Sequence, residues 1–352
     1  MAWAWRREWC ARAVGVALAL AAARWWQAWL PLLGTLALAR ALASACALWL
    51  APALPRRRLP GLSRRAVLVT GCDSGFGHEA ALRLDALGAR VFAGVLQPRG
   101  PGADRLRRLA PGRLRVLPLD VTDAASVAAA RDAVHAEVQE HGCELWAVVN
   151  NAGILQCAEC EWMDIDDLKQ ILDVNTLGPI RVTKAFLPLL RQSKGRIVNL
   201  ISLADEVVLS CLTPYTISKF ATFAFSKSLT SELSKFSISV HNIEPWIYRT
   251  NLTECASSIL EKKMEKIPED IKNVYSDEYK EKMKQLAYHA INLTSADQSK
   301  IYQVVESIED ACFSEDPLLR YTPGAHSKLV KHCSALIDFF QPIVLKFILR
   351  SK

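Results

Sequence analysis

Short apolar runs alternate with longer stretches of mixed polarity across the central part of the chain. The runs have the length and composition of buried strands, at Arg65–Thr70, Ala89–Leu96, Leu114–Leu119, Leu145–Val149, Arg196–Ile201 and Ser237–Ile243. The stretches between them predict helices, at a segment ending at Leu87, Ala124–His141, Ile165–Phe186 and Tyr215–Phe236. Strands that alternate with helices of this length predict an α/β domain, with a doubly wound parallel sheet of Rossmann type covered on both faces.

The pattern before residue 63 is that of a membrane segment. Only two arginines carry charge between residues 13 and 53, and seven of the ten tryptophans lie in the first 50 residues. Leu32–Ala53 has the ~20 residues that a bilayer span needs, and Ala13–Leu30 is a weaker second span. We predict that residues 1–62 form a membrane anchor and a linker. Two spans would place the body in the cytosol, whereas one span leaves the orientation open.

The net charge of +7 on the 352 residues belongs to the same head segment. Residues 1–72 hold ten arginines and one acid, whereas the remaining residues hold 33 basic and 35 acidic side chains. A nearly neutral body argues against a nucleic-acid-binding domain. Ten cysteines at this length do not indicate a disulfide framework, and the lone CxxC at Cys157–Cys160 has no partner pair. We therefore expect reduced thiols, no metal site and no nucleic-acid partner.

A glycine-rich turn follows the first predicted strand. It reads Thr70-Gly-x-x-x-Gly75-x-Gly77 and opens a helix. Gly71 allows the tight bend, Gly75 lets the backbone approach a pyrophosphate, and Gly77 lets the helix pack near the strand. The end of the second strand has no acid for a ribose 2′-hydroxyl, and Arg99 could meet a 2′-phosphate there. The turn itself has no basic residue, which favours NAD. The sequence therefore predicts a dinucleotide, NAD with NADP possible, and leaves the choice between them open.

Tyr215 and Lys219 lie one helical turn apart, on the same helix face. Ser202 follows the preceding strand, and Asn175 lies in the helix before it, so the four side chains could converge at one sheet edge. A free phenol has a pKa of ~10, and a neighbouring ammonium favours phenolate, the form that can take a proton from an alcohol. Ser202 can hydrogen-bond the substrate oxygen, and Asn175 can hold a water that relays protons from Lys219. The group predicts hydride exchange between a nicotinamide and an alcohol or ketone.

With these motifs together, the chain resembles the short-chain dehydrogenase/reductase family from about Arg64 to Gly324. The matching positions are Thr70–Gly77, Asp120, Asn150–Gly153, Asn175, Ser202, Tyr215, Lys219 and Pro245–Thr250. The resemblance implies a catalytic group made of Asn175, Ser202, Tyr215 and Lys219. It implies cofactor contacts from Gly71, Ser74, Gly75, Phe76, Gly77, Asp120, Asn150, Ala152, Gly153, Tyr215, Lys219 and Thr250. Within that set, Asp120 would contact adenine, Lys219 the nicotinamide ribose and Thr250 the carboxamide.

Finer segments are similar to the membrane-bound branch of the family, which holds hydroxysteroid, retinol and 3-hydroxybutyrate dehydrogenases. These segments are Ala66–Gly77, Val91–Leu96, Trp146–Gly153 and Arg320–Gly324. The resemblance implies a lipophilic substrate, a steroid of the 17β-hydroxy type or a retinoid, and an endoplasmic reticulum membrane location, with a homodimer as a further expectation. One departure is Trp246, which follows Pro245 where the family has glycine, so it reshapes the pocket, blocks it or points away.

The body is expected to span residues 63–325, with residues 251–290 as a lid that sets substrate specificity. The very apolar tail, residues 326–352, is expected to be packed core, a second membrane contact or a substrate entrance. Two alternatives stay open. One is a 3-hydroxybutyrate-type dehydrogenase of a mitochondrial membrane, and the other is a non-catalytic membrane-attached member of the family.

Overall fold

The computed structural model describes residue 40 and residues 57–334, 336–337 and 340. The chain divides into two units, residues 1–56 and residues 57–352. The predicted membrane segment, residues 1–62, lies almost entirely outside the residues that the structure describes. Among the residues that are described, no helix has both the length and the apolar character that a membrane crossing requires.

Seven parallel strands form one sheet in the order β3-β2-β1-β4-β5-β6-β7. They are β1 (Arg65–Val69), β2 (Arg90–Val95), β3 (Leu114–Pro118), β4 (Glu144–Asn150), β5 (Arg196–Leu200), β6 (Ser239–Ile243) and β7 (Arg320–Tyr321). The strand order reverses between β1 and β4, where Val69 is in register with Val149. The carboxyl ends of the strands at such a reversal are where doubly wound sheets bind ligands. The predicted Rossmann-type α/β fold is confirmed.

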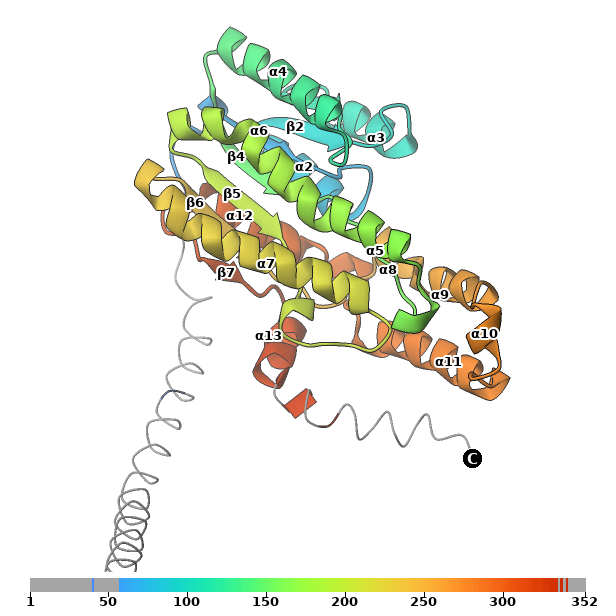
Figure 1. Ribbon diagram of the computed structural model, residues 1–352. Helices are drawn as coiled ribbons and strands as arrows, with labels where there is room; N and C mark the ends of the chain where they lie inside the picture. The colour runs from blue at the N-terminus through green and yellow to red at the C-terminus, as the bar shows by residue number, and fades with distance from the viewer. Residues whose placement is uncertain (1–39, 41–56, 335, 338–339, 341–352) are drawn as a thin grey trace, which may run out of the picture. The chain divides into compact units, whose positions relative to one another are not determined.

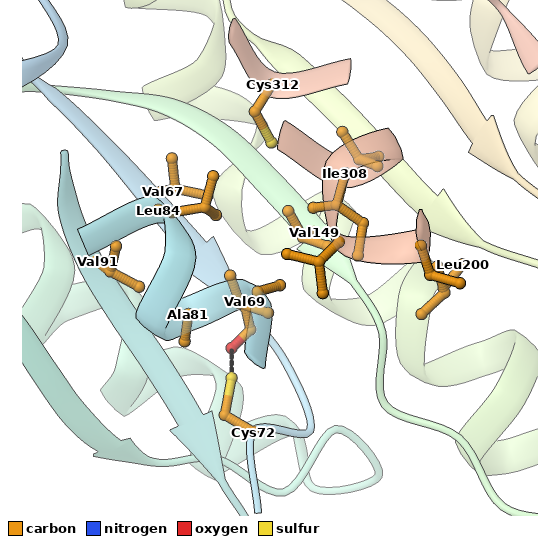
Figure 2. Close-up of a cluster of buried hydrophobic side chains, with 14 of the residues drawn as sticks. Val67, Val69, Cys72, Ala81, Leu84, Val91, Val149, Leu200, Ile308 and Cys312 are labelled. Carbon is orange, nitrogen blue, oxygen red and sulfur yellow. Dashed lines mark hydrogen bonds between the residues drawn. The ribbon is translucent and has the colours of Figure 1, made fainter. Parts of the chain in front are cut away.

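Helices cover both faces of the sheet (Figure 1). One face carries α2 (Gly75–Ala86), α3 (Pro101–Leu109) and α12 (Tyr302–Phe313), and the other carries α4 (Ala124–Glu140), α6 (Gly178–Ser193) and α7 (Thr213–Leu233). Alternation along β1 divides the two cores, because Val67 and Val69 face α2 while Ala66 and Leu68 face the opposite layer. Figure 2 shows the first core, with side chains Val67, Val69, Cys72, Ala81, Leu84, Val91, Val149, Leu200, Ile308 and Cys312.

The structure differs from the prediction in one predicted helix and in four elements that were not predicted. The stretch Ile165–Phe186 is not one α-helix, because α5 (Ile165–Leu172) passes through a π-helical turn at Asp173–Leu177 before α6 begins. Helix α3 was not predicted because Pro101 and Gly102 occupy its first turn, where proline is tolerated but the pair is typical of a linker. The elements α12 and the two-residue β7, together with α13 (Ala325–His332), follow the last predicted strand and were not predicted.

The segment predicted to be a lid, residues 251–290, is helical, and its last helix continues to Thr294. It comprises α8 (Asn251–Glu254), α9 (Ala256–Glu265), α10 (Glu269–Lys272) and α11 (Asp277–Thr294). Its core packs on the segment that follows β4, where the Trp162 ring meets the Tyr275 ring edge-on at 5.0 Å between centroids. Tyr279 Oη donates to Glu159 Oε1 at 2.8 Å, so these helices are held to that segment by polar as well as apolar contacts.

Candidate active site

A cavity of about 600 Å³ opens at the carboxyl ends of β1, β4, β5 and β6. Eleven of the fourteen predicted site residues line it: Gly71, Ser74, Gly75, Phe76, Asp120, Ala152, Gly153, Ser202, Tyr215, Lys219 and Thr250. The other three, Gly77, Asn150 and Asn175, do not line it. The structure thus brings the two halves of the predicted site, the glycine turn and the tyrosine–lysine pair, into one cavity.

The glycine turn has a backbone shape that side chains would prevent. Gly71 and Gly75 have φ of 69° and 63°, in the left-handed region that favours glycine. A Cβ on Gly71 would lie 2.7 Å from the Cα of Ala152, and a Cβ on Gly77 would lie 2.6 Å from the carbonyl oxygen of Gly71. The turn leads into α2, where Ser74 makes no side-chain capping bond to the first-turn N–H groups. A helix N-terminus with this entry suits an anion such as a pyrophosphate, so the cradle fits a dinucleotide.

Asn151 fastens the glycine turn to the end of β4. Its side-chain Nδ2 donates to the carbonyl oxygens of Thr70 and Gly71, at 2.8 Å and 3.0 Å. The Thr70 hydroxyl accepts from the backbone N–H groups of Asn151 and Ala152, both at 3.0 Å. Asn150, which the sequence singled out, instead points into the domain and donates to Asn199 Oδ1 at 2.8 Å. Sequence reasoning missed Asn151, although it stands in the same Asn-Asn-Ala-Gly motif.

Asp73 is a second missed residue in the cavity wall. Its carboxylate accepts from the backbone N–H groups of Leu96 and Gln97, each at 2.9 Å. These two residues directly follow β2, where the sequence lacks the acid expected for a ribose. Arg99, the residue proposed for a 2′-phosphate, is exposed and does not line the cavity. In the sequence, the only signal for a role of Asp73 is that it is an acid inside the glycine turn.

Tyr215 and Lys219 face one another on α7. The Lys219 Nζ lies 5.5 Å from the centre of the Tyr215 ring and donates to the carbonyl oxygen of Leu200 at 3.0 Å. Removal from water raises the pKa of Tyr215 to about 12, and its hydrogen bond with Ser202 acts in the opposite direction. Burial lowers the pKa of Lys219 to about 8, while the charge of Asp205 raises it. Tyr215 is therefore a neutral phenol here, and it needs added positive charge to become a base near neutral pH.

Asn175 supports Tyr215 and Lys219 indirectly, through hydrogen bonds that connect α7 to the loop after β4. It lies in the π-helical turn, a feature often found at functional sites. Its Nδ2 donates to the Ile154 carbonyl at 2.9 Å and to Ser218 Oγ at 3.0 Å, while its Oδ1 accepts from the Ile154 N–H at 2.8 Å. The side-chain amide of Asn175 thus joins the loop after β4, at Ile154, to Ser218 of α7. Its own backbone carbonyl accepts from the Thr222 hydroxyl at 2.8 Å.

Trp246 lines the cavity but leaves it open. Its backbone N–H donates to Ser327 Oγ at 3.1 Å, which ties the segment after β6 to α13. The indole Nε1 is buried without a hydrogen-bond partner. Thr250, four residues later, begins α8 through a reciprocal capping arrangement with Thr253 and also faces the cavity. Of the three expectations for Trp246, the structure favours a reshaped wall over a blocked pocket.

A buried charged cluster lies behind Ser202, and no sequence pattern predicts it. The Asp205 and Glu244 side chains have no exposed surface, and Arg320 bridges them and Glu206. Lys331 of α13 joins Glu244 at 2.9 Å. Burial and the charge of Glu244 raise the pKa of Asp205 to about 7, against the opposing effect of Arg320. Asp205 is the acid that supports the charged form of Lys219.

The comparisons with known proteins agree with this geometry. A family model described as short chain dehydrogenase matches residues 65–261. Estradiol 17-beta-dehydrogenase 2 of Mus musculus is 38% identical over 309 residues, which cover 85% of this chain and 79% of that protein. Retinol dehydrogenase 7 of Mus musculus is 39% identical over 276 residues, which cover 78% of this chain and 85% of that protein.

The fold is also that of a solved short-chain dehydrogenase/reductase from Burkholderia phymatum in complex with NAD. The match has a TM-score of 0.62 at 18% identity and covers 81% of this chain and 97% of that one. Since the family model spans more than half of the chain and the relatives span most of it, the resemblance drawn from the motifs is confirmed. The chain belongs to the short-chain dehydrogenase family and is an NAD(P)-dependent oxidoreductase.

Proposed function

We propose that the protein interconverts a hydroxyl and a keto or aldehyde group on a lipophilic alcohol, a steroid or a retinoid. The proposal rests on the contrast between a polar end and an apolar wall in the cavity. Ser202 and Tyr215 are polar groups at one end, and the wall beyond them is apolar, from Ile154, Leu155, Leu209, Leu212, Met283 and Leu286. Such a pocket suits a largely apolar molecule with one reactive oxygen. The names of the relatives, an estradiol and a retinol dehydrogenase, support the same substrate class.

The chemistry divides among three side chains. A nicotinamide dinucleotide, when bound, would be the source or the acceptor of the hydride. Ser202 donates a hydrogen bond to the substrate oxygen and stabilises its developing charge. Tyr215 exchanges the hydroxyl proton of the substrate, as a base in oxidation and as an acid in reduction. Lys219 holds a positive charge beside the phenol and favours its ionised form. The glycine turn, Asp120 and Thr250 are the residues that would hold the dinucleotide.

A turnover screen tests the proposal. Membranes that contain the full-length chain are supplied with NAD or NADP and with panels of steroids, retinol and 3-hydroxybutyrate. We expect turnover of a steroid or a retinoid and none of 3-hydroxybutyrate, because the small acid cannot fill an apolar cavity. Activity confined to 3-hydroxybutyrate would favour the mitochondrial alternative. The absence of any turnover above that of a Tyr215→Phe control would favour the non-catalytic alternative.

We further propose that residues 1–62 anchor the body to the endoplasmic reticulum membrane, on its cytosolic side. Support comes from the length of the apolar segment, its tryptophans and the arginines at both ends. A homodimer is part of the same proposal. Asn251 offers a marker of sidedness, because it is exposed and begins an Asn-Leu-Thr glycosylation triplet.

The full-length protein is expected in the microsomal fraction, resistant to alkaline carbonate and without an N-linked glycan. A glycan needs the lumenal transferase, which a cytosolic body never meets. The measurement is gel mobility before and after endoglycosidase, for the natural chain and for Asn251→Gln. Release into the carbonate supernatant would argue against the anchor. A glycan that disappears in Asn251→Gln would place the body in the lumen.

A further inference from the structure

We propose that Asp73 makes the adenosine end of the site select NAD over NADP. In this assignment its carboxylate accepts a hydrogen bond from the ribose 2′-hydroxyl and repels a 2′-phosphate. The inference rests on the dinucleotide-dependent function and names which of the two dinucleotides this site takes.

The position of the carboxylate is fixed by two hydrogen bonds. One oxygen accepts from the Leu96 N–H and the other from the Gln97 N–H, each at 2.9 Å. Asp73 therefore places a carboxylate at the end of β2, although it belongs to the turn between β1 and α2. In doubly wound dinucleotide sites, the end of β2 is where an acid meets the ribose 2′-hydroxyl. Each carboxylate oxygen can accept a second hydrogen bond, so both remain able to take a ribose hydroxyl.

The same two bonds occupy donors that a phosphate would need. Leu96 and Gln97 have the first backbone N–H groups beyond β2, and both already point at Asp73. A 2′-phosphate would meet a carboxylate instead of two N–H groups. At neutral pH it carries up to two negative charges, so its approach to Asp73 brings like charges together in a partly enclosed site.

The backbone around Asp73 has little room to move. Cys72 donates its N–H to the Gly94 carbonyl at 2.8 Å, which joins the turn to β2. Gly102, in the first turn of α3, lies against the Asp73 carbonyl so closely that a methyl group there would overlap it. The backbone of Asp73 is therefore held by the turn, by β2 and by α3, and the carboxylate can leave the end of β2 only by giving up both of its hydrogen bonds.

No basic side chain offsets this acid within the described wall of the cavity. The charged residues that line it are Asp73, Asp120 and Lys219, and Lys219 lies at the opposite end beside Tyr215. Nearby arginines are engaged elsewhere: Arg105 pairs with Glu79 at 3.3 Å, and Arg107 donates to the Pro98 carbonyl at 2.7 Å. The charge balance at the adenosine end is therefore negative.

The test uses ligands that lack the nicotinamide, so that Trp246 and the catalytic group have no influence. Binding of ADP-ribose and of 2′-phospho-ADP-ribose to the detergent-solubilised full-length chain is measured by calorimetry at constant ionic strength. We expect the natural chain to bind ADP-ribose about 100-fold more tightly. Asp73→Asn and Asp73→Ser should reduce that ratio to about tenfold or less, mainly by tighter binding of the phosphorylated ligand.

Two control variants separate the local effect from a general charge effect. Asp104→Asn removes an exposed carboxylate of α3 that pairs with Arg107, and it should leave the ratio unchanged. Arg99→Ala should also leave it unchanged, because Arg99 stands outside the cavity wall. Thermal unfolding of every variant shows whether it is folded, and Asp73→Ser stands in if Asp73→Asn is not.

The outcomes are distinguishable. A ratio near one in the natural chain, or a ratio that neither folded Asp73 variant changes, overturns the assignment of Asp73. A selective loss of 2′-phospho-ADP-ribose binding in Arg99→Ala also overturns it, since Arg99 would then hold the phosphate. If neither fragment and neither intact dinucleotide binds the natural chain, the dinucleotide-dependent function itself fails, whatever Asp73 does.

Discussion

Tyr215→Phe is expected to lower kcat by about 10³-fold, within the range that a positioned acid–base group contributes. The variant keeps the ring, so the packing of α7 and the 5.5 Å approach of Lys219 to that ring should persist. Only the hydroxyl that hydrogen-bonds Ser202 is lost. Steady-state turnover of a substrate identified in the screen, at saturating cofactor, is the measurement. Dinucleotide affinity should change little, because the glycine turn is untouched.

Tyr302→Phe is the matched control, since Tyr302 is 54% exposed on α12 and does not line the cavity. Its kcat should equal that of the natural protein. If Tyr215→Phe retained more than about a tenth of the natural kcat with the same pH profile, another group would be exchanging the proton.

Lys219→Met is expected to raise stability while it removes activity. The folded protein holds the Lys219 ammonium with a pKa near 8, below the 10.5 of an ordinary lysine. Below pH 8 both the folded and the unfolded chains are protonated, and burial of the charge costs about 3 kcal/mol. Methionine removes that cost and also the bond to the Leu200 carbonyl, worth about 1 kcal/mol. The net gain is about 2 kcal/mol below pH 8.

The sign of the pH dependence follows from the same shift. Between pH 8 and pH 10.5 the folded chain binds fewer protons than the unfolded one, so the natural protein gains stability as the pH rises. The advantage of Lys219→Met should therefore shrink through this window and vanish above it. Chemical denaturation at pH 7, 8.5 and 10, with turnover measured in parallel, gives both results. A variant that is less stable at pH 7 would show that the ammonium is better stabilised than its burial suggests.

The strands and the glycine turn could be predicted from the sequence because their signals are local. Predicted and observed strand ends differ by one or two residues, as for Arg65–Thr70 against β1. Glycines at 71, 75 and 77 are demanded by the backbone of the turn itself. The tyrosine–lysine pair follows from helical periodicity, and the structure places both side chains in the cavity.

What the sequence could not predict depends on contacts between distant segments. Asp73 matters because the end of β2 lies beside the glycine turn. Its hydrogen-bond partner Leu96 is 23 residues away along the chain. Asp205 matters because β7 brings Arg320 to it from 115 residues away. Arg99 was assigned a role from its place after a strand, yet α3 begins two residues later and leaves its side chain exposed. No periodic pattern encodes such neighbours.

The bonds of Asn151 have a consequence for folding. The glycine turn looks like a local structure, but its carbonyl groups at Thr70 and Gly71 are held by a side chain about 80 residues later in the chain. Bringing the two segments together costs chain entropy, and this cost arises before the contacts contribute any free energy. The dinucleotide cradle is therefore expected to form late, after β4 has paired with β1. Amide hydrogen exchange during refolding should show the turn protected together with β4, not with α2.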